Sequence, residues 1–336
     1  MDKFEIYKIG YFFMKKIKIN FVDFWPDFNK TNNYFYNLLI QKYELSIDEN
    51  PDLLFYSCYG KEYLKYNCIR IFYTAENIRA DFTACDFAFS FDYNKRKNHF
   101  RLPLYSMYVD LLNMLNKLQT IPSKEEAVKI WKNKSKFCCM VVSNPNSKER
   151  MTFFKNISKV IHVDSGGSVL NNVGGKVQDK FEFIKDYKFV ISFENSAHNG
   201  YTTEKILEPI YKDCIPIYWG NKLVDKDFNP KRFINYKDFK SEKELIDKLL
   251  EINENEALAI DMLMQPTFSN YKLAHEKERL KVFQIISNLI ENPKKPIARQ
   301  LWRHIHAYKL FYKKIKKLLV VKIQKIFIKS NKKDIE

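Results

Sequence analysis

The sequence predicts an α/β protein made of two Rossmann-like domains that face a cleft. Short apolar runs alternate with helical or polar segments in the first half, and a second alternating set begins near residue 136. Because this alternation is typical of parallel sheets, each half should fold around one. The length of 336 residues fits two domains, since ~150 residues is a common domain size.

The first domain is expected over residues 1–130 and the second over residues 131–292. Strands are predicted at 17–22, 53–56, 69–73 and 87–91, then at 137–143, 160–163, 188–194 and 215–219. Helices are predicted at 104–118, 146–158 and 203–212. Pro103 suits the first turn of the first helix, where a missing N–H costs little. Ligands of such folds bind at the carboxyl ends of the strands.

Composition and missing motifs exclude several classes of protein. The chain is 46% hydrophobic with 28 Phe and 21 Tyr, which is too rich in large apolar residues for a disordered protein. No Gly-x-Gly-x-x-Gly follows a predicted strand and no Walker A motif is present, which disfavours dinucleotide oxidoreductases and P-loop enzymes. The six cysteines form no Cys-x-x-Cys pattern, so buried free thiols are expected. With no signal-peptide pattern and no apolar run of ~18 residues, a cytoplasmic location is expected.

The net charge of +17 is concentrated at the C-terminal end. Residues 294–336 hold fourteen Lys and Arg against two acidic residues, which leaves only +5 for the rest of the chain. No recognition helix, zinc pattern or RNA-binding aromatic motif accompanies this charge, so no nucleic-acid partner is expected.

The charged tail, residues 293–336, has the pattern of a basic amphipathic helix. Apolar residues recur every three or four positions over 301–328, while Lys and Arg fill the other faces. This pattern is typical of a helix that lies on an anionic membrane surface, so a peripheral location on the inner face of the membrane is expected. A solvated face, packing on the protein and a homodimer contact remain alternatives.

The most informative stretch is residues 189–205, FVISFENSAHNGYTTEK, followed by IPIYWG at 215–220. It has the pattern of a buried strand, a polar loop, an amphipathic helix and a second buried strand. The helix should begin near Thr202 or Thr203, and its N-terminal amides and dipole favour an anion.

Three residues around this helix start suggest a ligand. Lys205 adds a positive charge in the first turn, which a bound diphosphate would explain. Glu204 could then bond sugar hydroxyls, and Tyr201 could stack on the ligand. The alternative is that Thr and Glu only cap the helix and Lys205 is solvated.

The ordered set FENS, YTTEK and IPIYWG resembles the signature of the α1,3/4-fucosyltransferase family, including its bacterial members. The resemblance covers roughly residues 17–250. Residues 72–77, FYTAEN, also resemble a family segment, although Ala75 stands where the family usually has Gly. Other segments similar to the family are 86–92, 101–105, 142–146, 163–167 and 227–230.

The resemblance implies a GT-B fold, with the acceptor bound mainly by the first domain and GDP-fucose by the second. It also implies site residues: Glu76 as the catalytic base, Arg150 on the phosphates, and Asn195, Tyr201, Glu204 and Lys205 in the donor site. The residues alone favour a loop or helix-cap carboxylate at Glu76, and the base role rests on the resemblance. Arg150 could be solvated on its helix, with Lys148 as an equal candidate.

No metal site is expected. The pair Asp225 and Asp227 matches an Asp-x-Asp pattern, but this pattern is short and falls after the signature. Arg150, Lys205 and the helix dipole could neutralise a diphosphate without a metal. No cofactor is therefore required, and stimulation by Mg²⁺ or Mn²⁺ stays open.

The expected function is an inverting glycosyltransferase. It would move fucose from GDP-β-L-fucose to the 3-OH of GlcNAc or glucose in a Galβ1,4-type oligosaccharide acceptor, such as lipopolysaccharide O-antigen. The enzymatic alternatives are another sugar nucleotide or a 1,4 linkage. The alternative of another class is a non-catalytic glycan-binding or membrane-binding protein.

Overall fold

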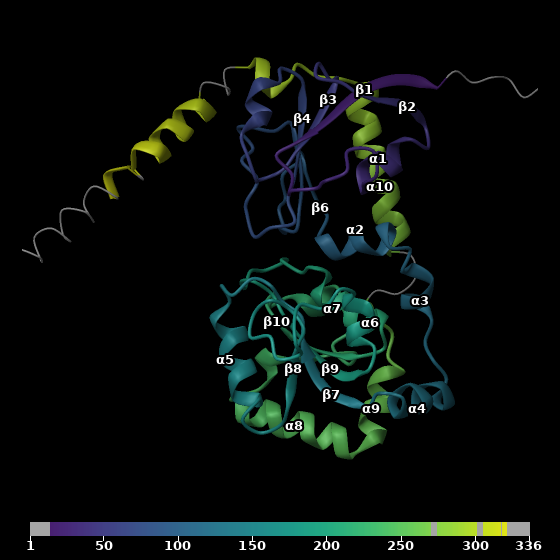
Figure 1. Ribbon diagram of the computed structural model, residues 1–336. Coiled ribbons are helices and arrows are strands. Elements are labelled where there is room, and N and C mark those ends of the chain that lie inside the picture. Colours follow the sequence, from purple (N-terminus) through teal and green to yellow (C-terminus); the bar gives the residue numbers. More distant parts are fainter. Residues whose placement is uncertain (1–13, 270–273, 301–304, 317, 321–336) are drawn as a thin grey trace, which may run out of the picture. The chain divides into compact units, whose positions relative to one another are not determined.

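The computed structural model describes residues 14–269, 274–300, 305–316 and 318–320 (Figure 1). Its contacts divide the chain into two compact units. Of the described residues, the first unit comprises 14–73, 80–88, 283–300, 305–316 and 318–320, and the second comprises 74–79, 89–269 and 274–282.

The first sheet has six strands in the order β2-β1-β3-β4-β5-β6. Its strands are β1 (Lys15–Val22), β2 (Tyr43–Ile47), β3 (Leu53–Tyr56), β4 (Ile69–Tyr73), β5 (Phe87–Ser90) and β6 (His99–Arg101). The pairs β1·β2, β1·β3 and β3·β4 are parallel. Every residue of β3 and of β4 is buried, as expected for parallel strands covered on both faces.

The helices between residues 34 and 119 differ from the sequence prediction at one point. They are α1 (Tyr34–Leu39), the 3-10 helix η1 (Glu62–Lys65), α2 (Leu104–Leu111) and α3 (Leu115–Gln119). The single helix predicted over 104–118 is wrong, because α2 and α3 are separate. Asn113 between them has φ of 50°, a left-handed conformation that ends an α-helix.

The second sheet has five parallel strands in the order β11-β10-β9-β7-β8. They are β7 (Lys136–Met140), β8 (Val163–Ser165), β9 (Tyr187–Phe193), β10 (Ile215–Trp219) and β11 (Ile234–Asn235). β7, β9 and β10 were predicted from the sequence, the strand predicted at 160–163 lies mostly before β8, and β11 was not predicted. The prediction of two parallel-sheet α/β domains is confirmed.

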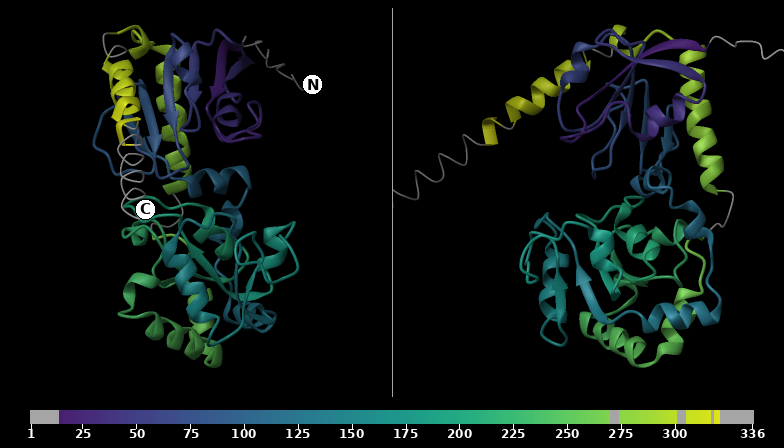
Figure 2. Two further views of the ribbon diagram at one scale, coloured as in Figure 1. Left: turned by 60° about the vertical axis from the view of Figure 1, so that its left-hand side comes forward. Right: turned by 45° about the vertical axis from the view of Figure 1, so that its right-hand side comes forward.

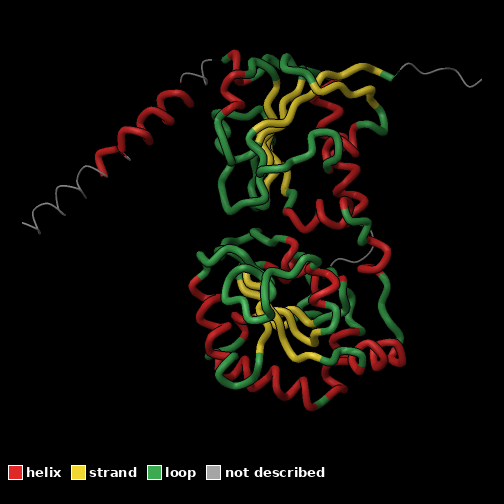
Figure 3. Tube along the Cα trace, in the orientation of Figure 1, coloured by secondary structure: helices red, strands yellow, loops and turns green. Residues whose placement is uncertain are grey.

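Helices cover both faces of the second sheet (Figures 2 and 3). They are α4 (Lys124–Lys132), α5 (Lys148–Ile157), α6 (Lys180–Ile184), α7 (Glu204–Tyr211), α8 (Glu242–Glu254) and α9 (Glu256–Leu263), with 3-10 turns η2 (Val224–Lys226) and η3 (Tyr236–Asp238). One apolar core joins α4, α5, α8 and α9 to β7, β9 and β10. A second core joins α7 to α2 and α3. These two cores join the sheet and its covering helices into one packed unit.

The chain returns to the first unit within α10 (Ala274–Glu291), which is followed by the 3-10 turn η4 (Ile297–Arg299). Of the predicted tail helix, residues 301–304, 317 and 321–328 lie outside the described residues. Residues 305–316 are helical. His306 is buried, and its Nε2 lies 2.8 Å from Tyr63 Oη, so the start of this helix is held on the first unit. Within the described part of the chain, no helix is long and apolar enough to span a membrane.

Candidate active site

The strand order of the second sheet indicates where a ligand would bind. Numbered along the chain, the order is 2-1-3-4-5, and it reverses between β7 and β9. Ligands of open parallel sheets bind outside the carboxyl ends of the strands at this switch point. The segment after β7 leads into α5, and the segment after β9, residues 194–203, leads into α7. Arg150 lies in the first turn of α5, and Asn195 and Tyr201 lie in the segment after β9.

Arg150 and Asn195 meet at the switch point. Arg150 lies in the first turn of α5, which Ser147 caps, and its side chain is fully buried. Its Nη2 donates a hydrogen bond of 2.9 Å to Asn195 Oδ1, whereas its Nε has no hydrogen-bond partner within the described residues. Burial lowers the pKa of Arg150, and Glu194 opposes that effect. A buried donor without a partner costs ~1–3 kcal/mol, so Arg150 Nε is suited to donate a hydrogen bond to an anionic oxygen.

Lys205 is held by two carboxylates and a hydroxyl. Its Nζ lies 3.0 Å from Thr203 Oγ1, 3.3 Å from Glu194 Oε2 and 3.5 Å from Glu204 Oε1. Burial lowers the pKa of Lys205, but the negative charges of Glu204 and Glu194 outweigh burial and raise it. The ammonium is therefore charged and has an acceptor for each of its three N–H bonds.

Glu194 is a site residue that the sequence prediction missed. It follows β9, is fully buried, and accepts hydrogen bonds of 2.7 Å from Thr203 N and 2.8 Å from Thr203 Oγ1. Thr203 is also the N-cap of α7. Burial raises the pKa of Glu194, and Lys205 lowers it. The anion at the N-terminus of α7 is thus the carboxylate of Glu194. Among the described residues, the cationic donor of this site that lacks a hydrogen-bond partner is Arg150 Nε, on α5.

Glu204 belongs to a longer chain of charges along α7. Burial raises the pKa of Glu204, but the positive charges of Lys205 and Lys180 outweigh burial and lower it below its ordinary value, so the carboxylate is ionised. Lys180, at the start of α6, also contacts Glu208 one turn further along α7. Burial raises the pKa of Glu208. The N-terminal half of α7 is therefore held by the ion pairs Glu204–Lys205 and Glu208–Lys180.

Two glycines let the backbone approach these groups. A Cβ on Gly220, which follows β10, would lie 2.6 Å from Glu194 Cγ, and Gly220 has φ of 153°. A Cβ on Gly200 would lie 2.2 Å from the carbonyl oxygen of Phe91, and Gly200 has φ of 91°. Only glycine combines such a conformation with such close approach.

Arg101 fixes the loop that carries Gly200. It forms a two-pronged ion pair with Asp227, with nitrogen–oxygen distances of 2.6 and 2.9 Å. Its other hydrogen bonds go to the carbonyl oxygens of Gly200 and Phe91. Asp227, one half of the Asp-x-Asp pattern, is therefore paired with an arginine. Among the described residues no cluster of three or more His, Cys, Asp or Glu could hold a metal ion.

Tyr201 lies near Glu194 and Lys205, and Glu76 lies near Tyr201. The ring of Tyr201 is buried and packs edge-on against Phe91 at a centroid distance of 5.0 Å. Burial raises the pKa of Tyr201, and the charges of Glu194 and, more weakly, Glu76 add to this. Glu76 is half-buried, and its neighbour Asn77 donates a 2.6 Å hydrogen bond to Ser196 Oγ. The Glu76 segment is thus tied to the loop of Asn195.

The structure brings the predicted residues of the second sheet together around one edge. Arg150 contacts Asn195, Lys205 contacts Glu204, and Tyr201 lies in the same loop. Sequence reasoning missed the buried Glu194 and the Arg101–Asp227 clamp. Glu194 stands inside the FENS signature, directly before Asn195, so its place in the motif was the one available signal.

Comparison with known proteins identifies the family. Two family models match: the alpha-(1,3)-fucosyltransferase FucT N-terminal domain over residues 19–108, and the glycosyltransferase family 10 (fucosyltransferase) C-terminal region over residues 131–306. The alpha-(1,3)-fucosyltransferase FucT of Helicobacter pylori is 33% identical over 292 residues, which cover 74% of this chain and 60% of that protein. The chain thus spans about 60% of the length of this relative.

Crystal structures of α1,3-fucosyltransferases are also similar. One is 29% identical with a TM-score of 0.74, and the match covers 88% of this chain and 95% of that one. Another, solved with GDP-fucose, is 30% identical with a TM-score of 0.69 and covers 86% and 94% of the two chains. The fold and the site therefore define a GT-B protein with a cationic site at its second parallel sheet. This chain belongs to glycosyltransferase family 10, the fucosyltransferase family.

Proposed function

We propose that this chain is an α1,3-fucosyltransferase that takes fucose from GDP-fucose. The single observation that carries the proposal is the buried Arg150, whose Nε has no hydrogen-bond partner within the described residues, beside Asn195 at the switch point of the second sheet. A diphosphate oxygen would supply the missing partner, and the planar guanidinium suits such an oxygen. Family membership and the likeness to a structure with GDP-fucose support fucose as the sugar.

The proposed reaction is a single displacement with inversion. The acceptor 3-OH of GlcNAc or glucose attacks C1 of β-linked fucose, the bond from C1 to the phosphate oxygen breaks, and GDP leaves. Glu76 takes the proton of the hydroxyl. Arg150 and Lys205 stabilise the negative charge that develops on GDP, while Asn195, Tyr201 and Glu204 position the donor.

The proposal assigns acceptor binding to residues 1–130 and donor binding to residues 131–292. The acceptor is a Galβ1,4-type glycan such as that of lipopolysaccharide.

Residues 301–328 would hold the protein peripherally on an anionic membrane. The described part of this segment supports that idea, since Tyr308 and Tyr312 are 68% and 59% exposed.

Transfer of labelled fucose from GDP-fucose to N-acetyllactosamine, in EDTA and with the linkage determined, tests the function. We expect a 1,3-linked product. A 1,4-linked product would replace the proposed linkage, and transfer from another sugar nucleotide alone would replace the donor. Binding of GDP without any transfer would favour the non-catalytic alternative. Loss of transfer in EDTA, restored by Mg²⁺ or Mn²⁺, would show that a metal is required.

Replacing Arg150 by Met should weaken GDP binding by about 10- to 100-fold, because a charged hydrogen bond to phosphate is worth ~1.5–3 kcal/mol. The same change should not lower the melting temperature, because the free protein loses a buried and incompletely bonded charge. Calorimetric titration with GDP and a thermal melt measure the two effects.

Lys148→Met is the matched control, since it removes one positive charge from the same helical turn at an exposed position. It should leave GDP affinity within about twofold, as expected for an exposed, screened charge. Equal losses in the two variants would mean that general charge, rather than Arg150, attracts GDP.

A further inference from the structure

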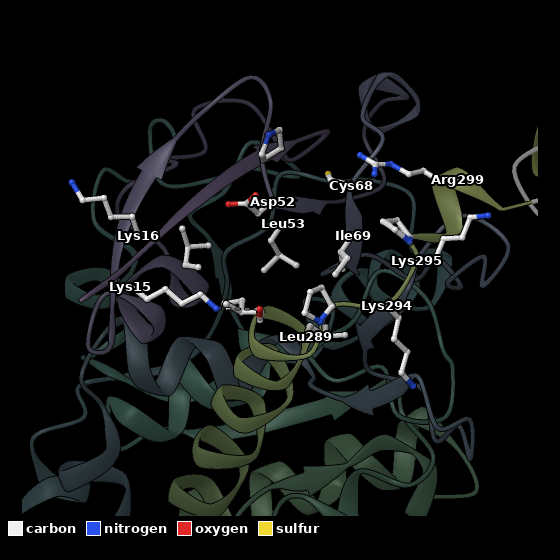
Figure 4. Close-up of a pocket in the computed structure, with 15 residues that line it drawn as sticks. Lys15, Lys16, Asp52, Leu53, Cys68, Ile69, Leu289, Lys294, Lys295 and Arg299 are labelled. Carbon is white, nitrogen blue, oxygen red and sulfur yellow. Dashed lines mark hydrogen bonds between the residues drawn. The ribbon is translucent and has the colours of Figure 1, made fainter. Parts of the chain in front are cut away.

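The side chains at the two ends of β4 are arranged differently. A cavity of about 580 Å³ lies at the start of β4, beside Ile69 (Figure 4). Figure 4 shows that the ammonium groups of Lys294 and Lys295 point away from the centre of this cavity and from each other. β4 ends at Tyr73. The polar side chains of the next segment, residues 74–79, instead contact one another and the loop after β9.

The Glu76 segment, residues 74–79, is held from within by hydrogen bonds of its own. It belongs to the second unit, as the loop after β9 does. Glu76 N donates to Thr74 Oγ1 at 3.0 Å, and Thr74 Oγ1 donates to the Glu76 carbonyl oxygen at 3.1 Å. Ile78 N donates to the same carbonyl oxygen at 2.6 Å. These bonds fix the backbone beside Glu76, but the place of the whole segment depends on its contacts with the rest of the unit.

Asn77 links the Glu76 segment to the loop after β9. Its Nδ2 donates a 2.6 Å hydrogen bond to Ser196 Oγ. Asn77 is half-buried, which lowers the local dielectric constant and strengthens such a bond. Ser196 directly follows Asn195, whose Oδ1 accepts a 2.9 Å hydrogen bond from Arg150 Nη2. Two hydrogen bonds and two peptide links therefore connect Glu76 to Arg150.

Arg79 fixes the orientation of the Asn77 amide. Arg79 Nη2 donates to Asn77 Oδ1, and a guanidinium carries only donors. The amide oxygen must therefore face Arg79, which leaves Nδ2 to face Ser196. The guanidinium is itself held in place, because its Cζ lies 4.5 Å from the centroid of the Phe91 ring and its Nη1 lies 3.4 Å from Asp92 Oδ1.

Asp92 gives the Glu76 segment a second attachment to the same loop. Its Oδ1 lies 3.2 Å from His198 Nε2 as well as 3.4 Å from Arg79 Nη1, and its side chain is only 17% exposed. Ser196 and His198 both lie in the loop between β9 and α7. The Glu76 segment is therefore attached to this loop through Asn77 and, by way of Asp92, through Arg79. Two attachments restrict rotation of the segment as well as its distance from the loop.

We propose that Asn77 is a positioning residue for proton transfer: its hydrogen bond to Ser196 holds Glu76 at the distance from the donor-site loop at which the carboxylate reaches the acceptor hydroxyl. This inference rests on the proposed function, in which Glu76 is the base. Asn77 acts through Glu76 and contacts no substrate. Because a displacement of about 1 Å can cost ~10²-fold in rate, loss of this hydrogen bond should lower turnover far more than donor binding.

Asn77→Ala should lower the turnover number of fucosyl transfer by about 10- to 100-fold. Calorimetry should show GDP-fucose affinity within about threefold of the parent, because Arg150 and Asn195 keep their contact. Asn156→Ala is the matched control, since Asn156 is also half-buried and its Nδ2 donates to Glu242 at the same distance of 2.6 Å, between α5 and α8. Each variant loses one hydrogen bond, so the two melting temperatures should fall by similar amounts, but Asn156→Ala should keep parental turnover.

Ser196→Ala removes the same hydrogen bond from its other end. It should lower turnover by about the same factor as Asn77→Ala, and the double variant should lose no more than either single variant. Additive losses would mean that the two residues act separately, and they would overturn the proposal.

Combination with Glu76→Gln tests whether Asn77 acts through Glu76. In the Glu76→Gln protein, Asn77→Ala should change turnover by less than about twofold, because the base that it positions is already absent. A further loss of about tenfold or more in that protein would overturn the proposal. Parental turnover in Asn77→Ala, beside a slow Glu76→Gln protein, would reject only the positioning role. Parental turnover in Glu76→Gln would reject the proposed base itself.

Discussion

Glu76→Gln should lower the turnover number of fucosyl transfer by ~10²–10⁴-fold, the usual contribution of a positioned general base. Gln has nearly the same shape but cannot take the proton of the acceptor hydroxyl. The backbone of this segment should not change, because Glu76 N donates to Thr74 Oγ1 at 3.0 Å and Ile78 N donates to the Glu76 carbonyl at 2.6 Å. Calorimetry should therefore show nearly unchanged GDP-fucose affinity, while initial rates fall.

Glu62→Gln is a suitable control for this measurement. It makes the same substitution at an exposed carboxylate in η1, where no role in transfer is proposed. Its rate should equal that of the parent. A Glu76→Gln protein with parental turnover would remove Glu76 as the base. Loss of donor affinity equal to the loss of rate would indicate a binding role instead.

The sequence predicted the inner strands of both sheets but missed the edge strands β2, β6 and β11 and placed the edge strand β8 too early. Fully buried parallel strands such as β3 and β4 are mostly apolar runs, and a run of this kind is visible without any partner. The break between α2 and α3 depends on the backbone of Asn113, which adopts φ of 50°. Apolar spacing continues across this residue, so periodicity alone predicted one helix.

The composition of the candidate site was easier to predict than its contacts. The motif indicated that Arg150, Asn195 and Lys205 belong together, but it did not show which groups would neutralise them. Lys205 pairs with Glu194, a carboxylate with no exposure to solvent. Glu194 and Lys205 are 11 positions apart, and their pairing depends on how the loop between β9 and α7 folds back, so local residue type does not report it.

Lys205→Met should destabilise the protein by ~3–5 kcal/mol, because it leaves the buried Glu194 without its cation. Urea unfolding at neutral pH measures this change. Lys185→Met is the control, since Lys185 pairs with Glu182 at the surface, where both side chains are about half exposed. It should cost no more than ~1 kcal/mol. If the two variants lost equal stability, the Glu194–Lys205 pair would contribute no more to the free energy of unfolding than a surface ion pair.

The same variant should show a pH dependence of defined sign. Burial raises the pKa of Glu194 above its ordinary value of 4.5, and Lys205 opposes this, so the Met variant raises that pKa further. A carboxyl whose folded-state pKa is raised favours folding at pH below its ordinary value, and this stability is lost as pH rises through the folded-state pKa. The loss of stability in Lys205→Met should therefore become smaller toward acid pH.

Glu194→Gln/Lys205→Met should recover most of the stability at neutral pH. GDP affinity in that double variant then measures the phosphate contact of Lys205 alone: parental affinity would remove Lys205 from the donor site, and a tenfold or greater loss would keep it there.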